Sequence, residues 1–138
     1  MAASAFNMYN NSKRYLVDGT LDLYTDTIVA SLYKSDSNAS TFTLSLSSEL
    51  TNPVSTGGYA PQTLAITIND NALSTGVDAT DLVWTASGAD ITSIQFLAIS
   101  ESGGKLLCWC ALSTAAFSVT SGNTLTVSFN AAGIFTMQ

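Results

Sequence analysis

The sequence predicts an all-β protein: an antiparallel β-sandwich or barrel-like domain with one short N-terminal helix. Two observations support this fold class. Apolar residues recur at every second position in seven or eight short segments, and clusters of Gly, Asn, Asp and Ser separate these segments. A chain of 138 residues can also bury a core without disulfides or metals. Because no repeat or linker interrupts it, we expect a single domain over residues 1–138, in which residues 1–18 form a helix or arm.

The first elements follow from a change in the apolar period. From Ala5 to Val17 the apolar residues have helical spacing, and Asp18-Gly19 supplies a stop signal after them. Alternation from Leu21 to Tyr33 predicts the first strand, and alternation from Thr41 to Leu50 predicts the second, which Pro53 then terminates. The chain therefore changes from helix to strand after Gly19.

Six further segments have the pattern of strands, at residues 63–68, 81–86, 91–100, 106–112, 117–120 and 124–129. On the 91–100 strand we expect Ile94, Phe96 and Ala98 on one face and Gln95, Leu97 and Ile99 on the other. Residues 102–105 predict a hairpin into the 106–112 run, which is apolar enough to be covered on both faces. A turn is expected at residues 69–71. The apolar tail at 133–138 is expected to pack on the core or on a neighbour.

The composition indicates a surface suited to burial in an assembly. The chain is 46% hydrophobic and only 10% charged, so Ser, Thr, Asn and Gly must cover much of its surface. With a net charge of −6 and four cations, Lys13, Arg14, Lys34 and Lys105, it cannot neutralise many phosphates, and we expect no nucleic-acid partner. No window approaches the roughly 18 apolar residues of a membrane span, so we expect a soluble, unexported chain.

The sequence offers little catalytic chemistry. Histidine is absent, which removes the commonest general base and metal ligand. A carboxylate pair such as Glu49 and Glu101 could still serve an acid-base hydrolase. The aspartates lie beside turn residues and are interpreted as turn caps: Asp36, Asp70, Asp78, Asp81 and Asp90. Residues 69–71 with Asp78 and Asp81 lack the spacing of a calcium loop. We therefore expect no catalytic, cofactor or metal site and no enzymatic activity.

The cysteines and aromatic residues are expected to have structural roles. Cys108 and Cys110 flank Trp109 and would share one face of a strand about 6.5 to 7 Å apart, which is too far for an unstrained disulfide. We interpret them as small apolar side chains on a buried face. The alternative for the aromatic residues is a sugar-stacking platform, which core or interface packing outweighs. The candidates for that platform are Trp84, Trp109, Tyr9, Tyr15, Tyr24, Tyr33 and Tyr59.

The order of short motifs resembles a family of small structural proteins of tailed bacteriophages. The matching segments cover almost the whole chain: Tyr9 to Lys13, Leu21 to Tyr33, Gly57 to Tyr59, Gln62 to Leu64, Asp81 to Ala86, Ile94 to Ile99 and Phe129 to Phe135. Each motif is short, and the resemblance depends on their order and spacing. The chain departs from the pattern at residues 106–112, where Cys108-Trp109-Cys110 is unusual.

The resemblance implies a virion component without an active site, assembled in the cytoplasm of a host bacterium. We expect a capsid decoration or cement protein that contacts the major capsid protein or other virion proteins and forms a homo-oligomer, such as a trimer. A tail, neck or fibre-associated component is the nearest alternative, and a carbohydrate-binding β-sandwich module is an alternative of another class. Contacts are expected at the segment before Gly19, at the C-terminal tail and at the Cys108-Trp109-Cys110 strand.

Overall fold

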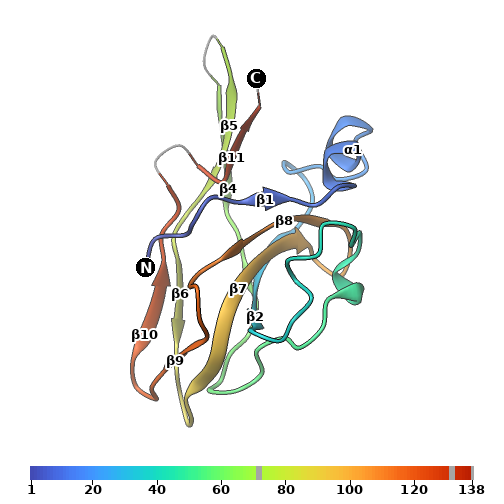
Figure 1. Ribbon diagram of the computed structural model, residues 1–138. Coiled ribbons are helices and arrows are strands. Elements are labelled where there is room, and N and C mark those ends of the chain that lie inside the picture. The colour runs from blue at the N-terminus through green and yellow to red at the C-terminus, as the bar shows by residue number, and fades with distance from the viewer. Residues whose placement is uncertain (71–72, 131–132, 138) are drawn as a thin grey trace.

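The computed structural model describes residues 1–70, 73–130 and 133–137 and confirms an all-β fold with one short α-helix (Figure 1). The helices are α1 (Ser12–Val17) and the 3₁₀-helix η1 (Ser47–Glu49). The strands are β1 (Asn7–Met8), β2 (Ile28–Lys34), β3 (Gln62–Thr63), β4 (Ile66–Asp70), β5 (Thr75–Ala79), β6 (Leu82–Thr85), β7 (Ile91–Glu101), β8 (Leu106–Ala111), β9 (Phe117–Val119), β10 (Thr124–Val127) and β11 (Phe135–Met137). All strand pairs between these elements are antiparallel.

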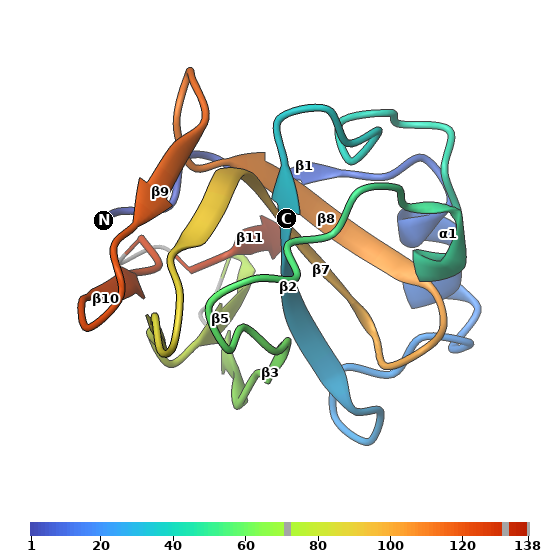
Figure 2. The same cartoon turned by 90° about the horizontal axis from the view of Figure 1, so that it is seen from below.

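The largest sheet is built around β7. Its order is β1-β8-β7-β2-β3, and β9 also pairs with β7. The predicted hairpin at residues 102–105 is confirmed, because it joins β7 to β8. Seen from below, β9 and β10 lie at one end of the molecule and α1 lies at the other (Figure 2). The long central strand thus connects two well-separated ends of the molecule.

Both faces of this sheet are covered, as the apolar run at 106–112 predicted. Leu97, Ile99, Cys108 and Cys110 enter the main hydrophobic core and are fully buried. The other face carries a smaller cluster, in which Tyr33, Ala39 and Ala98 are buried beneath Leu50, Phe96 and Trp109. Two-sided burial explains why the central hairpin lacks a clean alternation of polar and apolar residues.

On β7, Phe96 and Ala98 lie on one face and Leu97 and Ile99 on the other, as predicted, but Ile94 was assigned to the wrong face. The pairing of β7 with β2 shifts by one residue between Tyr33↔Phe96 and Lys34↔Ile94. This bulge turns Ile94 into the main core with Leu97 instead of leaving it beside Phe96. Ser93 nearby has a positive φ of 61°, which marks the same irregularity.

The N-terminal helix is shorter than the predicted range of residues 5–17. Asn7 and Met8 pair with Trp109 and Cys108 at the open edge of β8, so this part of the chain is extended. Tyr9 is fully buried, and its hydroxyl donates to the Ala39 carbonyl oxygen at 2.5 Å. Tertiary pairing has overridden the helical spacing, and α1 begins only at Ser12.

Two predicted strand segments form turns because carboxylates bind their backbone. Residues 22–26, expected in the first strand, form a turn in which the Asp22 and Asp26 carboxylates accept backbone N–H groups. Residues 41–50, expected as a strand, contain turns, an isolated bridge at Leu46 and η1. There the Glu49 carboxylate accepts N–H groups from Ser45 and Leu46, both at 2.7 Å. A short polar side chain that binds nearby amides competes with strand pairing.

The third sheet, in the order β11-β5-β4, projects beyond the main body (Figure 1). The predicted strand at 63–68 is divided here, because the chain leaves β3 and enters this sheet as β4. Asn69 and Asp70, expected in a turn, belong to β4, and Asn71 lies outside the described residues. The tail packs as expected: Ile134 is buried, and β11 pairs with β5, while Gln138 lies outside the described residues. Strand β5 was not predicted.

Gly57 permits a close approach between the loop after β2 and the start of β7. Its φ is +67°, and a Cβ built on it would lie 2.8 Å from the Ala89 carbonyl oxygen and from Asp90 backbone carbon. Gly88 has a similar φ of +76° but open space around it. Substitutions at the two glycines therefore distinguish the cost of backbone strain from the cost of a steric clash.

We expect Gly57→Ala to lower the free energy of unfolding by about 3 kcal/mol, because strain and a backbone clash act together. Gly88→Ala should cost about 1 kcal/mol, because strain acts alone. Urea unfolding of the two variants and the parent chain measures both changes. Equal costs for the two substitutions would show that the close contact at Gly57 does not exist in solution.

Candidate docking surface

Glu49 and Glu101, the two glutamates considered for acid-base chemistry, lie at two neighbouring loops. Their carboxylates accept backbone N–H groups and so hold these loops in place. The Ser47 N–H donates to the Gly104 carbonyl oxygen at 2.8 Å, which joins the loops. The N–H groups of Leu46 and Ser45 lower the pKa of Glu49, and the N–H of Lys105 lowers that of Glu101. A general acid needs a raised pKa, whereas the pKa values of both glutamates are lowered.

The aspartates interpreted as turn caps accept hydrogen bonds, but two of them join distant segments instead of capping a local turn. Asp81 accepts from the Phe129 N–H and Asp90 from the Ser121 N–H, so both hold neighbouring parts of the fold together. Asp70 and Asp78 accept from the nearby Thr75 hydroxyl and Ala79 N–H, and the Asp36 carbonyl oxygen accepts from the Asn52 side-chain amide. Across residues 1–70, 73–130 and 133–137, no three His, Cys, Asp or Glu side chains come together as a metal site would require.

The Cys108-Trp109-Cys110 strand contributes to both hydrophobic clusters. Cys108 and Cys110 are buried free thiols on the inner face. Burial raises the pKa of Cys110 to about 12 and raises that of Cys108 well above its usual range. Trp109 lies on the outer face, where Phe42 and Phe96 pack edge-on against it at centroid distances of 5.7 and 6.1 Å. Among the residues that the structure describes, its buried indole N–H has no hydrogen-bond partner.

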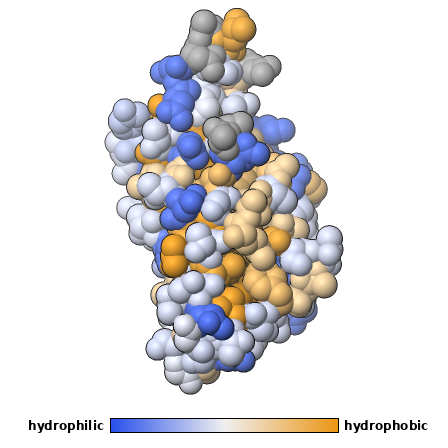
Figure 3. All heavy atoms as spheres, turned by 90° about the vertical axis from the view of Figure 1, so that its left-hand side faces the viewer, coloured by the Kyte–Doolittle hydropathy of each residue, from blue (hydrophilic) through white to orange (hydrophobic). Residues whose placement is uncertain are grey.

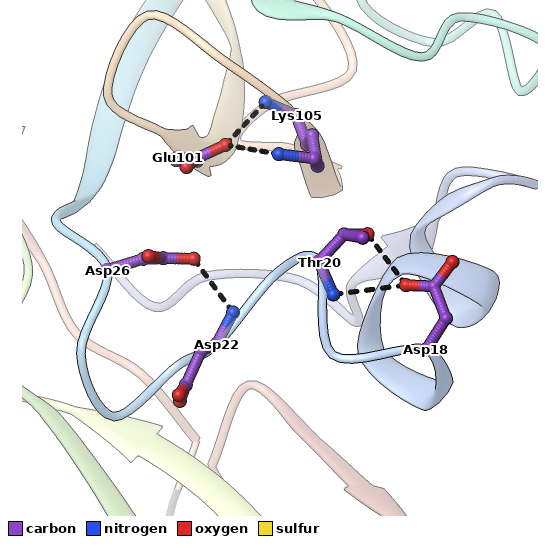
Figure 4. A network of polar contacts seen from close by, with 6 residues as sticks. All are labelled: Asp18, Thr20, Asp22, Asp26, Glu101 and Lys105. Atoms are coloured by element: carbon purple, nitrogen blue, oxygen red, sulfur yellow. Dashed lines mark hydrogen bonds and ion pairs between the residues drawn. The ribbon is translucent and has the colours of Figure 1, made fainter.

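Helix α1 and the turn that follows it form a rigid corner of the molecule. The fully buried Ser12 begins the helix, and Gly19, with a φ of +76°, ends it. Asp18 then accepts from the N–H and hydroxyl of Thr20 at 3.0 and 2.6 Å (Figure 4). These bonds, the hydroxyl contact first, lower the pKa of Asp18. The corner is therefore held in place by local hydrogen bonds.

The turn at residues 22–26 is held in the same way. The Asp22 N–H donates to the Asp26 carboxylate at 2.8 Å (Figure 4). The Tyr24 N–H donates to the Asp22 carboxylate, also at 2.8 Å. The bond from Tyr24 is the main reason that the pKa of Asp22 is lowered. Buried residues Leu21 and Ile28 fix the two ends of the turn to the core. The tip of the turn is thus pre-organised although it lies outside the body.

This corner presents large apolar side chains to solvent. Tyr24 is 83% exposed at the tip of the turn, and Val17 is 82% exposed at the end of α1. Nearby, Met137 of β11 is half exposed. Apolar side chains held in solvent by a rigid backbone are typical of protein–protein contact sites. We call α1, the turn at 18–26 and the adjoining part of β11 the α1 surface.

Two shallow grooves border Tyr24 and Val17. One, of about 310 Å³, lies between α1 and β11 and is lined by Met8, Lys13, Leu16, Val17, Thr136 and Met137. The other, of about 270 Å³, lies between the turn and β4 and is lined by Leu23, Tyr24, Ile66, Thr67 and Ile68. Their volumes are at or below the lower end of the range for ligand pockets, which suits one inserted side chain better than a whole ligand.

A second apolar area lies on the side that carries the N-terminal segment and β10 (Figure 3). Met1 and Val83 are each 48% exposed there, on either side of Thr126. The N-terminal segment, expected to reach a neighbour, lies along β10 of its own chain, where Ala3 N–H donates to the Ser128 carbonyl oxygen. Residues 1–6 and strands β6, β9 and β10 contain no Lys or Arg.

The comparisons with known proteins do not identify this chain. No family model matches it, and no similar curated protein or solved structure was found. Within the described residues, no helix has the length and apolar character needed to cross a membrane.

Sequence reasoning pointed to the segment before Gly19 and to the C-terminal tail as contact regions, and both contribute to the α1 surface. It did not identify the exposure of Val17 and Tyr24, because both lie within segments expected to form a regular helix and a strand. The acidic residues on each side of Tyr24 were the available signal, since Asp at such spacing favours a capped turn.

We expect the native chain to be inert to a thiol reagent such as DTNB at mildly alkaline pH, because both thiols are buried and protonated. The same chain in denaturant should react with two equivalents, one for each cysteine. Absorbance of the released thiolate measures both. Rapid labelling of the native protein would show that one cysteine is accessible and reactive.

The lowered pKa values of Asp18 and Asp22 predict a stability that depends on acid. Their contribution is complete above the ordinary carboxyl pKa of 3.8 and is lost as the pH falls through the lower folded-state values. We expect Asp18→Asn/Asp22→Asn to flatten the fall in unfolding free energy between about pH 5 and pH 2. Urea unfolding across this range measures the slope, and identical slopes would refute the role of these carboxylates.

Proposed function

We propose that this chain is a non-enzymatic structural subunit of a tailed-bacteriophage particle that acts as a capsid decoration or cement protein. The observation that carries the proposal is a charge-poor surface with two separate areas that each hold exposed apolar side chains, Val17, Tyr24 and Met137 in one and Met1 and Val83 in the other. Two contact areas allow one subunit to bridge neighbours. The ordered resemblance to phage structural proteins supplies the kind of particle.

The state of the carboxylates and thiols supports a role without catalysis. Catalytic groups usually have pKa values moved toward the working pH. Here the pKa values of Glu49 and Glu101 are lowered by backbone N–H donors, and that of Cys110 is raised to about 12 by burial. Each shift moves the pKa of the group away from neutral pH. The two carboxylates hold loops through their hydrogen bonds, and the thiol packs in the core.

The carbohydrate-binding alternative receives little support from the two tryptophans. Trp84 is 3% exposed, and its indole N–H donates to the Ala60 carbonyl oxygen at 2.9 Å. Trp109 is covered by the edges of Phe42 and Phe96. Stacking on a sugar needs an open aromatic face, and these side chains are used in packing instead.

A shell location agrees with weak contacts that are repeated many times. Surface Ser, Thr and Asn side chains lose little hydration energy when a neighbour covers them. Individual contacts of this kind are weak, but a subunit held at several points on a lattice of shell proteins is retained by their combined effect. A tail, neck or fibre-associated position uses the same chemistry and differs in location.

Immunogold labelling of purified particles, with mass spectrometry of the same sample, tests this proposal. We expect the chain among the particle proteins and gold over the shell. Particles from a culture in which the gene is deleted provide the matched control. Gold confined to the tail would overturn the decoration role, and absence of the chain from particles would overturn both particle roles.

A further inference from the structure

The apolar side chains of the α1 surface occur together with most of the positive charge of the chain. Lys13 and Arg14 are exposed on α1, and Lys105 lies 6.0 Å from the centre of the Tyr15 ring. These are three of the four cations in the sequence. Lys34 is the remaining one, whereas six of the ten carboxylates lie outside the α1 region and its neighbour Glu101. Charge is therefore distributed unevenly over the molecule.

This distribution decides where a second copy of an anionic chain can dock. A contact through the N-terminal and β10 side would bring Asp81 and Asp90 of two copies together, and among residues 1–6 and strands β6, β9 and β10 the N-terminal ammonium, which donates to the Thr126 carbonyl oxygen, is the only cation to offset them. The α1 surface carries both signs within a few residues: Lys13 and Arg14 on the helix, and Asp18, Asp22 and Asp26 on the turn. Arg14 already pairs with Asp18 of its own chain at 3.6 Å, which leaves Lys13 to pair with the carboxylates of a second copy. A surface that contains both signs can complement itself, and like-charge contacts are costly.

We infer that the α1 surface binds the α1 surface of a second copy of this chain in a reciprocal, two-fold contact. Tyr24 of each copy enters the groove between α1 and β11 of the other, where Met8, Leu16, Val17 and Met137 surround it. Lys13, which lines that groove, then faces the Asp22 and Asp26 carboxylates beside the incoming tyrosine. This extends the proposed function, because it names a partner and a site for self-association.

The rigidity of the turn favours such a contact. Binding a flexible loop costs conformational entropy, but the turn at 22–26 is already ordered by three hydrogen bonds at 2.8 Å. The tyrosine adds a large buried area with few rotatable bonds. The projecting Tyr24 side chain and the groove lie at the same end of each molecule. One two-fold rotation therefore places each tyrosine in the groove of the other copy and gives a closed assembly. The reciprocal geometry favours a dimer over the trimer that shell symmetry suggests.

Sedimentation equilibrium of the purified chain over a concentration series tests the inference. We expect a dimer with twice the chain mass of 14.4 kDa, weakened by added salt. Tyr24→Ser should raise the dissociation constant by at least about tenfold, as loss of a central aromatic contact does. Lys13→Glu should weaken the dimer as well. Both sites are exposed, so circular dichroism should show an unchanged fold.

Val83→Ser provides the matched control, because Val83 is an exposed apolar residue on the opposite side and should leave the dimer unchanged. A monomer at every concentration, a trimer, or a dimer that tolerates both Tyr24→Ser and Lys13→Glu would overturn the inference. If the chain is monomeric but Tyr24→Ser reduces its incorporation into particles, another protein occupies the surface, which also overturns it.

The two proposals fail separately. A chain that is found on the shell but is monomeric in solution retains the proposed function and refutes self-association. A chain that forms the dimer but is absent from particles refutes the proposed function and retains self-association.

Discussion

The structure depends on the burial of β7 on both faces. This strand pairs with β2, with β9 and with its hairpin partner β8, so three segments are aligned by one backbone. On one face Leu97 and Ile99 fill the main core, and on the other Ala98 lies beneath the Trp109 cluster. A central strand that is apolar on both sides fixes its neighbours from above and below. Its length also sets the distance between α1 and the β10 side (Figure 2).

The loops around this scaffold are organised by carboxylates. Asp18 and Asp22 bind backbone N–H groups of the corner after α1, and Glu49 and Glu101 bind those of two neighbouring loops. These groups are unavailable for proton transfer at neutral pH for the same reason that they hold the loops. The physical feature that argues against catalysis is thus the one that gives the exposed Tyr24 a fixed position.

The strands that could be predicted from the sequence are those with one buried face and those that are buried on both faces. β6 and β10 alternate clearly, and Trp84 and Leu125 pair across them as buried partners. β5 was missed because Val77 is its only buried residue, which leaves no pattern to detect. The helix was overextended because the pairing of Asn7 and Met8 with β8 is a long-range contact, invisible in local spacing.

The contact site was predictable in part, for a similar reason. Composition indicated a surface suited to burial, and the segments before Gly19 and at the C-terminus were expected to make contacts. Periodicity shows which residues can share a face, but exposure depends on what the rest of the chain covers. Val17 and Tyr24 have the apolar character of core residues, but Val17 lies at the exposed end of α1, and the turn made by Asp22 and Asp26 holds Tyr24 in solvent.

Hydrogen–deuterium exchange, compared between a dilute and a concentrated solution of the chain, tests the central claim most directly. In both samples the slowest amides should lie in β2, β7 and β8, the strands buried on both faces. Concentration should add protection at residues 12–26 and 133–137 and leave residues 82–85 and 124–127 unchanged. Protection that appears on β6 and β10 instead, with none at α1 or the Tyr24 turn, would contradict the account.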